Sequence, residues 1–246
     1  MKKKIIAANW KLNKSPLEAT QFIADFKTLI SSDKNFFDRN EILIFPSAFC
    51  LDAVSKSVVG LPIYFGPQNI FTEKSGAFTG ENSAEVAKSL GAEVNLIGHS
   101  ERRQLFNEAD LVLNQKVKLS QSLKMTAVFC IGETLQQRES NQTQSICFSQ
   151  LEKGLANINP QERIIVAYEP VWAIGTGKVA SVAQVAEVHL QLFQKLTAMG
   201  FQNFQLLYGG SVKPENAKEL LQVDHVDGFL IGGASLIPDS FFKICS

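Results

Sequence analysis

Residues 163–170, RIIVAYEP, hold a short run of apolar side chains that ends abruptly in Glu169 and Pro170. The run lacks polar alternation and is rich in Ile and Val, which is typical of a strand buried on both faces of a parallel sheet. Apolar residues three and four apart follow at 182–199, VAQVAEVHLQLFQKLTAM, and predict a helix. The stretch therefore predicts one strand–helix unit with a carboxylate where its strand ends.

The same unit recurs along the chain. Further apolar runs predict buried strands at 4–9, 41–45, 61–66, 93–98, 125–132, 204–210 and 226–233. Helical periodicity predicts helices at 16–30, 83–90, 111–123, 144–158 and 214–221. About eight such units favour an α/β fold, a single parallel (β/α)8 barrel domain over residues 1–246, with a doubly wound open sheet as the competing topology.

Composition limits the class of protein. The chain is 45% hydrophobic and 20% charged, and its 24 basic residues balance its 24 acidic residues, which argues against a nucleic acid partner. No apolar run approaches membrane-spanning length, so we expect no membrane partner. The cysteines form no CxxC pair, which argues against a zinc site and a disulfide framework and favours a reducing cytoplasm. These cysteines are Cys50, Cys130, Cys147 and Cys245.

Ionisable and polar residues gather where the predicted strands end. Asn9 and Lys11 follow the first strand, His99 and Glu101 follow the fourth, and Glu169 follows the sixth. Taken singly, each has an ordinary explanation: a turn former, a solvated lysine, or a histidine near a helix start. In a parallel barrel, however, these strand ends open on one rim, which is where the chemistry lies. Their convergence predicts a catalytic site.

Glycines follow the last two strands, at Gly209, Gly210, Gly232 and Gly233. A parallel strand commonly leaves its sheet through glycine, which is the ordinary structural explanation. Two such exits beside Ser211 also place backbone N–H groups where they bind phosphate in barrels. We therefore expect a phosphorylated ligand.

Motifs spread over the whole chain resemble the triosephosphate isomerase family. They are NWK at 9–11, GAFTGE at 76–81, GHSERR at 98–103, CIGET at 130–134, AYEPVWAIGTGK at 167–178, YGGSVKPENA at 208–217 and GFLIGGASL at 228–236. The resemblance implies an aldose–ketose isomerase that interconverts dihydroxyacetone phosphate and D-glyceraldehyde 3-phosphate in glycolysis and gluconeogenesis. It implies no cofactor, neither a metal nor an organic group.

The chemistry of that reaction explains why these residue types are needed. Moving a carbonyl between adjacent carbons requires a base that removes a carbon-bound proton and returns it to the neighbouring carbon through an enediolate. Glu169 fits this base, and the loop that begins at Pro170 and Trp172 would strip its water and strengthen its basicity. The alternative is a strand-end carboxylate that caps a neighbouring group.

The resemblance assigns roles to the other charged residues of the rim. It implies that His99 is a neutral hydrogen-bond donor and that Lys11 is a fixed positive charge, both acting on the developing oxyanion. Glu101 resembles the buried carboxylate that holds the lysine in the family. A salt bridge from Glu101 to Arg102 or Arg103 is the alternative.

The resemblance also implies a set of substrate-binding residues and a lid. The substrate-binding residues are Asn9, Lys11, Gly175, Ser211, Gly232 and Gly233. The lid residues are Pro170, Val171, Trp172, Ala173, Ile174, Gly175, Thr176, Gly177 and Lys178. Binding of the remote phosphate dianion would drive the closure of this lid and exclude water.

Residues 66–82, GPQNIFTEKSGAFTGEN, form a connection longer than most and carry Phe71 and Phe78. The resemblance implies that this loop enters a second copy of the chain in a homodimer, with Thr79 reaching the partner's active site. A self-packed Ω-loop is the alternative.

Two other classes of function remain open at this stage. A Schiff-base lyase on a phosphate-binding barrel would need a lysine inside the barrel, whereas the sixth strand presents Glu169. A scaffold that has lost catalysis would show a broken rim, whereas every expected group is present. Two details lie away from the rim: Asn95 interrupts the fourth strand, and Cys130 has the plain role of a small buried residue.

Overall fold

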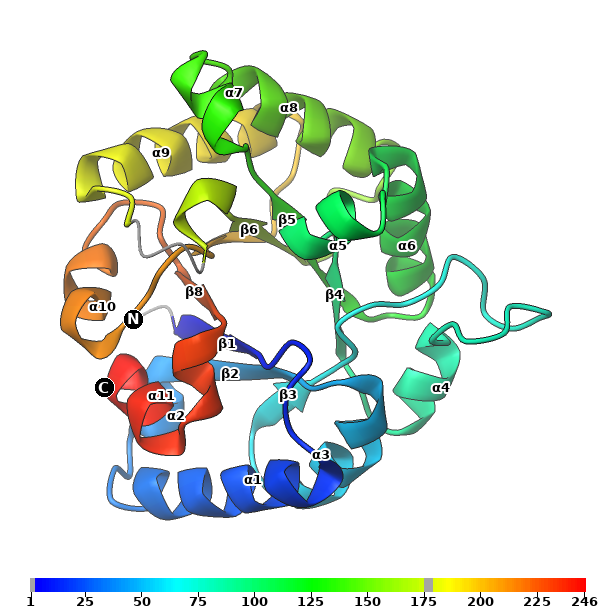
Figure 1. Cartoon of the computed structure of the whole chain (residues 1–246), viewed down its shortest axis with the longest axis vertical. Helices are drawn as coiled ribbons and strands as arrows, with labels where there is room; N and C mark the ends of the chain where they lie inside the picture. Colours follow the sequence, from blue (N-terminus) through cyan, green and yellow to red (C-terminus); the bar gives the residue numbers. More distant parts are fainter. Residues whose placement is uncertain (1–2, 175–178) are drawn as a thin grey trace.

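The computed structural model describes residues 3–174 and 179–246. Its eight strands form one barrel with helices around it (Figure 1). The strands are β1 Lys4–Asn9, β2 Asn40–Phe45, β3 Ile63–Phe65, β4 Val94–Ile97, β5 Thr126–Ile131, β6 Ile164–Tyr168, β7 Phe204–Tyr208 and β8 Gly228–Ile231. Each lies within a predicted run or extends it by one residue.

The strand order distinguishes a barrel from an open sheet. The order is β3-β2-β1-β8-β7-β6-β5-β4, and every paired ladder is parallel. The two outer strands of that order meet, because Glu93 N–H donates to the Phe65 carbonyl and Leu96 N–H to the Pro67 carbonyl, both at 3.1 Å. The sheet thus closes on itself, and the predicted (β/α)8 barrel is confirmed.

Helices alternate with the strands. They are α1 Pro16–Ile30, α2 Phe36–Arg39, α3 Leu51–Ser57, α4 Ala84–Ser89, α5 Ser100–Leu105, α6 Asp110–Ser122, α7 Leu135–Glu139, α8 Thr143–Gly154, α9 Val182–Ala198, α10 Pro214–Leu220 and α11 Pro238–Cys245. The short 3-10 helices are η1 Ala48–Cys50, η2 Val171–Ala173 and η3 Gly233–Leu236. The helix predicted at 144–158 ends early, before Asn157 turns the backbone left-handed at φ 57°.

Local sequence explains where the long helices begin. Ser15 caps α1 through a reciprocal pair of hydrogen bonds with Glu18, and Pro16 occupies the first helical position, where its missing N–H costs nothing. Ser181 and Gln184 form the same capping box at α9. Both helices bury one apolar face against the barrel, as their periodicity predicted.

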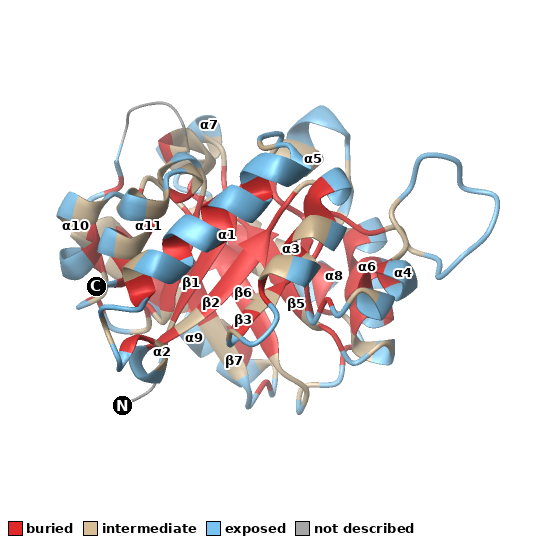
Figure 2. Cartoon of the chain, turned by 90° about the horizontal axis from the view of Figure 1, so that it is seen from below, coloured by how far each residue is buried: buried red, intermediate tan, exposed pale blue. Residues whose placement is uncertain are grey.

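Two apolar layers result from the alternation of side chains along each strand. Ile5 and Ala7 of β1 point into the barrel, whereas Ile6 and Ala8 point toward the helices. Figure 2 shows this buried centre and the exposed outer faces of the helices. Asn95 also points outward from β4, where its Nδ2 donates to Ser120 Oγ of α6 at 3.0 Å, so the polar interruption is hydrogen-bonded.

Within the described ranges, no helix combines the length and the apolar character that crossing a bilayer requires.

Candidate active site

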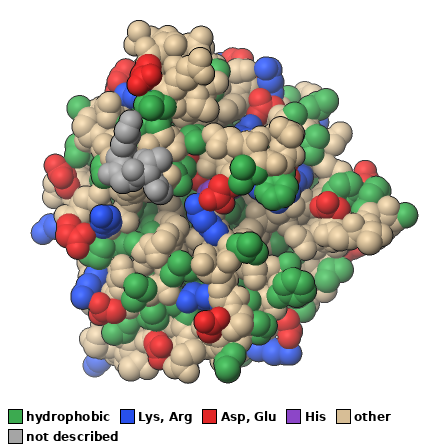
Figure 3. Space-filling view, viewed as in Figure 1, with side chains coloured by type: hydrophobic (Ala, Val, Ile, Leu, Met, Phe, Trp, Pro, Cys, Tyr) green, Lys and Arg blue, Asp and Glu red, His purple; other side chains and the backbone are tan. Residues whose placement is uncertain are grey.

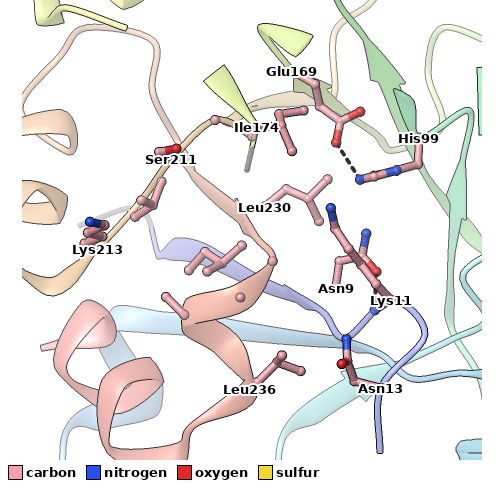
Figure 4. A pocket seen from close by; sticks show the side chains of 17 residues that line it. Asn9, Lys11, Asn13, His99, Glu169, Ile174, Ser211, Lys213, Leu230 and Leu236 are labelled. Atoms are coloured by element: carbon pink, nitrogen blue, oxygen red, sulfur yellow. Dashed lines mark hydrogen bonds and ion pairs between the residues drawn. The ribbon is translucent and has the colours of Figure 1, made fainter. Parts of the chain in front are cut away.

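Glu169 and His99 face each other across the carboxyl ends of the strands (Figure 4). Glu169 follows β6 and is 2% exposed, and its Oε1 lies 3.0 Å from His99 Nε2. Its Oε2 accepts the backbone N–H of Ser100 at 2.9 Å. The carboxylate therefore sits in a defined position, held by the first residues after β4.

The hydrogen bonds of His99 define its tautomer. His99 caps α5, and its Nδ1 accepts the N–H of Glu101 at 3.3 Å. A ring nitrogen that accepts carries no proton, so the proton is assigned to Nε2, from which it is donated to Glu169. The sequence did not define the tautomer, and the neutral imidazole that the resemblance implied stays a prediction.

Burial and the interaction with neighbouring groups shift the pKa in opposite directions, both for His99 and for Glu169. Burial lowers the pKa of His99, but the adjacent Glu169 carboxylate raises it above the usual value. Burial raises the pKa of Glu169, as the sequence led us to expect, yet His99, the Ser100 N–H and Lys11 together hold that pKa below the usual value. The carboxylate is thus ionised but a weaker base than burial alone would make it.

Lys11 lies beside this pair with a left-handed backbone, at φ 52°. Its N–H donates to Asn9 Oδ1 at 3.0 Å, and Gln68 Nε2 donates to its carbonyl at 2.8 Å. These contacts hold a conformation that a non-glycine residue rarely adopts. Its side chain lines the same cavity as Glu169 and His99. Basic and acidic side chains lie next to each other near the middle of the face that Figure 3 shows.

Glu101 binds Lys11, with Oε1 and Nζ 2.6 Å apart. The arginines proposed as alternative partners bind elsewhere: Arg102 pairs with Glu108, and Arg103 pairs with Asp110. One expectation was wrong for the single chain, because the Glu101 side chain is 45% exposed and not buried. The reason is local: Glu101 lies in the first turn of α5, facing the outer side of the rim.

A cavity of about 290 Å³ extends from this pair to the ends of β7 and β8. Ser211, Gly232 and Gly233 line it, together with Asn9 and Lys11, so five of the six predicted substrate-binding residues lie together. The sixth, Gly175, falls outside the described residues, as do Thr176, Gly177 and Lys178 of the predicted lid. Of the remaining lid residues, Ile174 lines the cavity, and Ala173 accepts a hydrogen bond from Ser211 Oγ at 2.8 Å.

A neighbouring side chain limits the space at two of the glycines that follow these strands. A Cβ on Gly209 would lie 2.9 Å from Cγ of Glu169, and one on Gly232 would lie 3.3 Å from Cε of Lys11. A Cβ on Gly233, by contrast, would meet no atom within 4 Å. The positive φ angles among the described glycines lie at other positions.

Several lining residues were missed by reasoning from sequence. Asn13, Lys213 and Leu230 border the cavity. Lys213 lies within the YGGSVK motif, which was a usable signal, whereas Leu230 belongs to an apolar strand and looks like core. Glu133 of the CIGET motif was also missed: it is fully buried and accepts Trp172 Nε1 at 2.9 Å, beneath the first lid residues.

The described residues contain no group of three or more His, Cys, Asp or Glu side chains arranged to hold a metal ion.

The site can therefore support acid–base chemistry on a small anionic substrate. A buried carboxylate and an imidazole face one end of the cavity, Lys11 also lines it, and the glycine turns that follow β7 and β8 line the other end. Together with the fold, this arrangement defines a (β/α)8-barrel enzyme that transfers protons on phosphorylated ligands.

Comparison with known proteins identifies the family to which the chain belongs within this class of enzyme. The family model described as triosephosphate isomerase matches residues 4–246. A triosephosphate isomerase from Bdellovibrio bacteriovorus is 52% identical over 99% of both chains, and one from Thermodesulfovibrio yellowstonii is 41% identical, also over 99% of both. One from Lawsonia intracellularis is 41% identical, over 98% of this chain and 96% of the relative. The chain belongs to the triosephosphate isomerase family.

Proposed function

We propose that the site residues described above carry out the interconversion of dihydroxyacetone phosphate and D-glyceraldehyde 3-phosphate, in glycolysis and gluconeogenesis. The chain is an isomerase of the aldose–ketose type, and its substrate is a triose phosphate, as the family match and the names of its relatives support. The observation that carries the assignment of roles is the Glu169–His99 pair at one end of a cavity whose other end is lined by glycines.

Glu169 acts as the base. It removes a proton from the hydroxyl-bearing carbon next to the substrate carbonyl, and the hydroxyl proton moves to the former carbonyl oxygen. The Glu169 carboxyl, whose proton exchanges with solvent, then protonates the neighbouring carbon and completes the isomerisation. Both of its oxygens have partners, His99 Nε2 and the Ser100 N–H. Substrate therefore has to displace His99 from Glu169, and this exchange frees the carboxylate to accept a proton.

The same exchange prepares His99. Once released, Nε2–H donates to the substrate oxygen that becomes negative in the enediolate, while Nδ1 still accepts from the α5 backbone. Lys11 adds a positive charge beside that oxygen and is held in place by Glu101. Asn9 adds a hydrogen bond to the substrate oxygen, because its amide lies on the same face of the cavity (Figure 4).

Ser211, Gly232 and Gly233 bind the phosphate at the opposite end of the cavity, and Gly175 is proposed as the fourth ligand. Backbone N–H groups suit a dianion because they need no side-chain reorganisation. The predicted lid, residues 170–178, is proposed to close over the phosphate. In its described part, the Ser211–Ala173 hydrogen bond supports a link between phosphate binding and the lid.

We further propose that the chain forms a homodimer through the loop 66–82. This loop projects from the barrel, and Thr79 is exposed on it (Figure 2). Phe71 and Phe78 pack on each other at 4.4 Å between ring centroids. Beside Lys11 lies a second cavity of about 450 Å³, with Leu12, 97% exposed, at its edge. A second copy's loop would cover this apolar surface and the exposed side of Glu101.

Sedimentation of the wild-type chain tests the homodimer. We expect a species of twice 27.1 kDa, and Phe78→Asp should shift it to the monomer. Val59→Asp is the matched control, because Val59 is an apolar side chain 78% exposed on a different part of the surface. A monomeric wild type at micromolar concentration contradicts this assembly.

A reducing cytoplasm is proposed as the compartment. All four cysteines are buried and unpaired, which suits an environment that does not form disulfides.

Isomerisation of D-glyceraldehyde 3-phosphate in deuterium oxide tests the mechanism. Proton transfer through Glu169 should introduce solvent deuterium at the carbon next to the carbonyl of the product, whereas an internal hydride shift would introduce none. Borohydride trapping with substrate should leave the chain unmodified, because no Schiff base forms. Turnover without deuterium would remove Glu169 from its proposed role.

A further inference from the structure

Lys14 adopts a backbone conformation that favours glycine. Its φ is 70°, in the left-handed region, where a Cβ crowds the following carbonyl. Glycine would avoid this strain, which the contacts of the lysine side chain can offset.

The Lys14 side chain bridges the two ends of the sequence. Its Nζ donates to the carbonyl of Leu236 at 2.9 Å. The same ammonium lies 5.3 Å from the ring centroid of Trp10 and 4.8 Å from that of Phe22, within range of cation–π attraction. The backbone of Lys14 is also held, because Cys50 Sγ donates to its carbonyl at 3.1 Å. Both ends of the residue are therefore fixed.

The acceptor belongs to the phosphate end of the active site. Leu236 is the last residue of η3, which begins at Gly233 directly after Gly232. Ser235 Oγ donates to the Gly232 carbonyl at 2.7 Å, which fixes the start of this short helix. The Lys14 bond fixes its end, and Leu236 itself lines the catalytic cavity. Lys14 does not line that cavity and so acts from behind its wall.

We propose that Lys14 is a positioning residue for phosphate binding: by holding the Leu236 carbonyl, it keeps η3 and the Gly232–Gly233 turn in place against the substrate's phosphate. This inference rests on the proposed function and deepens it. It predicts that Lys14 governs affinity for the phosphate group while the proton-transfer end of the site is unaffected.

Steady-state kinetics with a phosphorylated and an unphosphorylated substrate distinguish effects on the phosphate end of the site from effects on the proton-transfer end. Lys14→Met keeps most of the aliphatic stem and removes the charge. Losing a charged hydrogen bond of this kind should raise KM for D-glyceraldehyde 3-phosphate, and Ki for inorganic phosphate, by about tenfold. The specificity constant for D-glyceraldehyde, which has no phosphate, should stay within about twofold of wild type, because Glu169, His99 and Lys11 are untouched.

Three variants serve as comparisons. Lys14→Arg keeps a donor and should recover part of the affinity. Lys14→Gly relieves the left-handed strain, so it should fold well and still bind phosphate weakly. Lys56→Met removes one exposed lysine, paired with Asp52 on α3, and should leave both constants unchanged.

Each outcome decides the proposal. Raised phosphate constants in both the Met and Gly variants, with D-glyceraldehyde turnover kept, support it. Unchanged phosphate constants in Lys14→Gly, or equal losses with both substrates, overturn it, whatever happens to Tm. Failure of the proposed function is a separate result, because the wild-type chain would then not isomerise D-glyceraldehyde 3-phosphate at all.

Discussion

The two ends of the active-site cavity differ in the kind of residue that lines them. At the proton-transfer end, each charged side chain already has a partner: Glu169 has His99, and Lys11 has Glu101. At the phosphate end, four glycines line the cavity together with side chains such as Ser211 and Lys213, and missing side chains at the glycines provide space. The first end works by exchanging partners, whereas the second works by shape. Mutations at the proton-transfer end should therefore change mainly kcat, whereas mutations at the phosphate end should change mainly KM.

The largest expected effect comes from removing the base. Glu169→Gln keeps the size of the side chain, and its amide oxygen can still accept the Ser100 N–H, but it cannot take a proton. We expect kcat to fall by about 10³-fold with KM little changed. A coupled assay of isomerisation measures both constants. Glu162→Gln, which alters an acid paired with Lys124 outside the site, is the control. A loss of kcat smaller than tenfold would contradict the assignment.

The next effect is a pH dependence of stability that arises from His189. Its ring packs against residues that support both ends of the active-site cavity. Its ring lies edge-on to Tyr168 at 6.1 Å and tilted toward Tyr208 at 6.5 Å, and these tyrosines directly precede Glu169 and Gly209. Its Nδ1 lies 3.0 Å from the His225 carbonyl, to which it donates. Burial lowers the pKa of His189 to about 4. The folded chain thus keeps this ring neutral at pH values where the unfolded chain would protonate it.

The sign of the pH dependence follows from that difference. Between the unfolded value, about 6.5, and the folded value, about 4, the unfolded state binds the extra proton. The contribution to the free energy of unfolding is complete above pH 6.5 and falls by roughly 3 kcal/mol as pH drops to 4. Denaturant unfolding between pH 4 and 7 measures it. His189→Gln should show a flatter profile, and parallel profiles would refute the idea.

A smaller effect tests the space left by glycine. Gly209→Ala would place a Cβ 2.9 Å from Glu169 Cγ and displace the base, so we expect kcat to fall by about tenfold. Gly232→Ala, with its Cβ 3.3 Å from Lys11 Cε, should cost less. Gly233→Ala is the comparison, since its Cβ meets no protein atom within 4 Å. Its kcat should stay within about twofold of wild type, and any loss should fall on KM, because Gly233 is a proposed phosphate ligand. Equal losses in all three would mean that backbone freedom, and not space, decides these positions.

The sequence predicted the barrel well because burial on both faces makes each strand a solid apolar run. It also predicted which side chains share the rim, since Lys11, His99 and Glu169 each follow a strand end. The short helices α2, α3, α5, α7 and α11 were not predicted. They have four to eight residues, about two turns at most, which is too few for a helical period to show.

Features that depend on contacts between distant residues could not be predicted. The tautomer of His99 depends on a backbone N–H of α5, and the exposure of Glu101 depends on which surface its helix turn faces. The hydrogen bond from Lys14 to Leu236 joins residues 222 positions apart, so no local sequence pattern indicates it. The glycines were recognised, but their reason, the position of a neighbouring side chain, required coordinates.

The closure of the barrel between β3 and β4 has a consequence for how folding and assembly depend on each other. There, Glu93 and Leu96 donate backbone hydrogen bonds to Phe65 and Pro67, and the projecting loop 66–82 leaves from the same place. A second copy that binds this loop would also stabilise the contact between β3 and β4. Amide hydrogen exchange at Glu93 and Leu96 should then slow as protein concentration rises, by mass action, while amides in the β5–β6 ladder exchange at a rate set by the single chain.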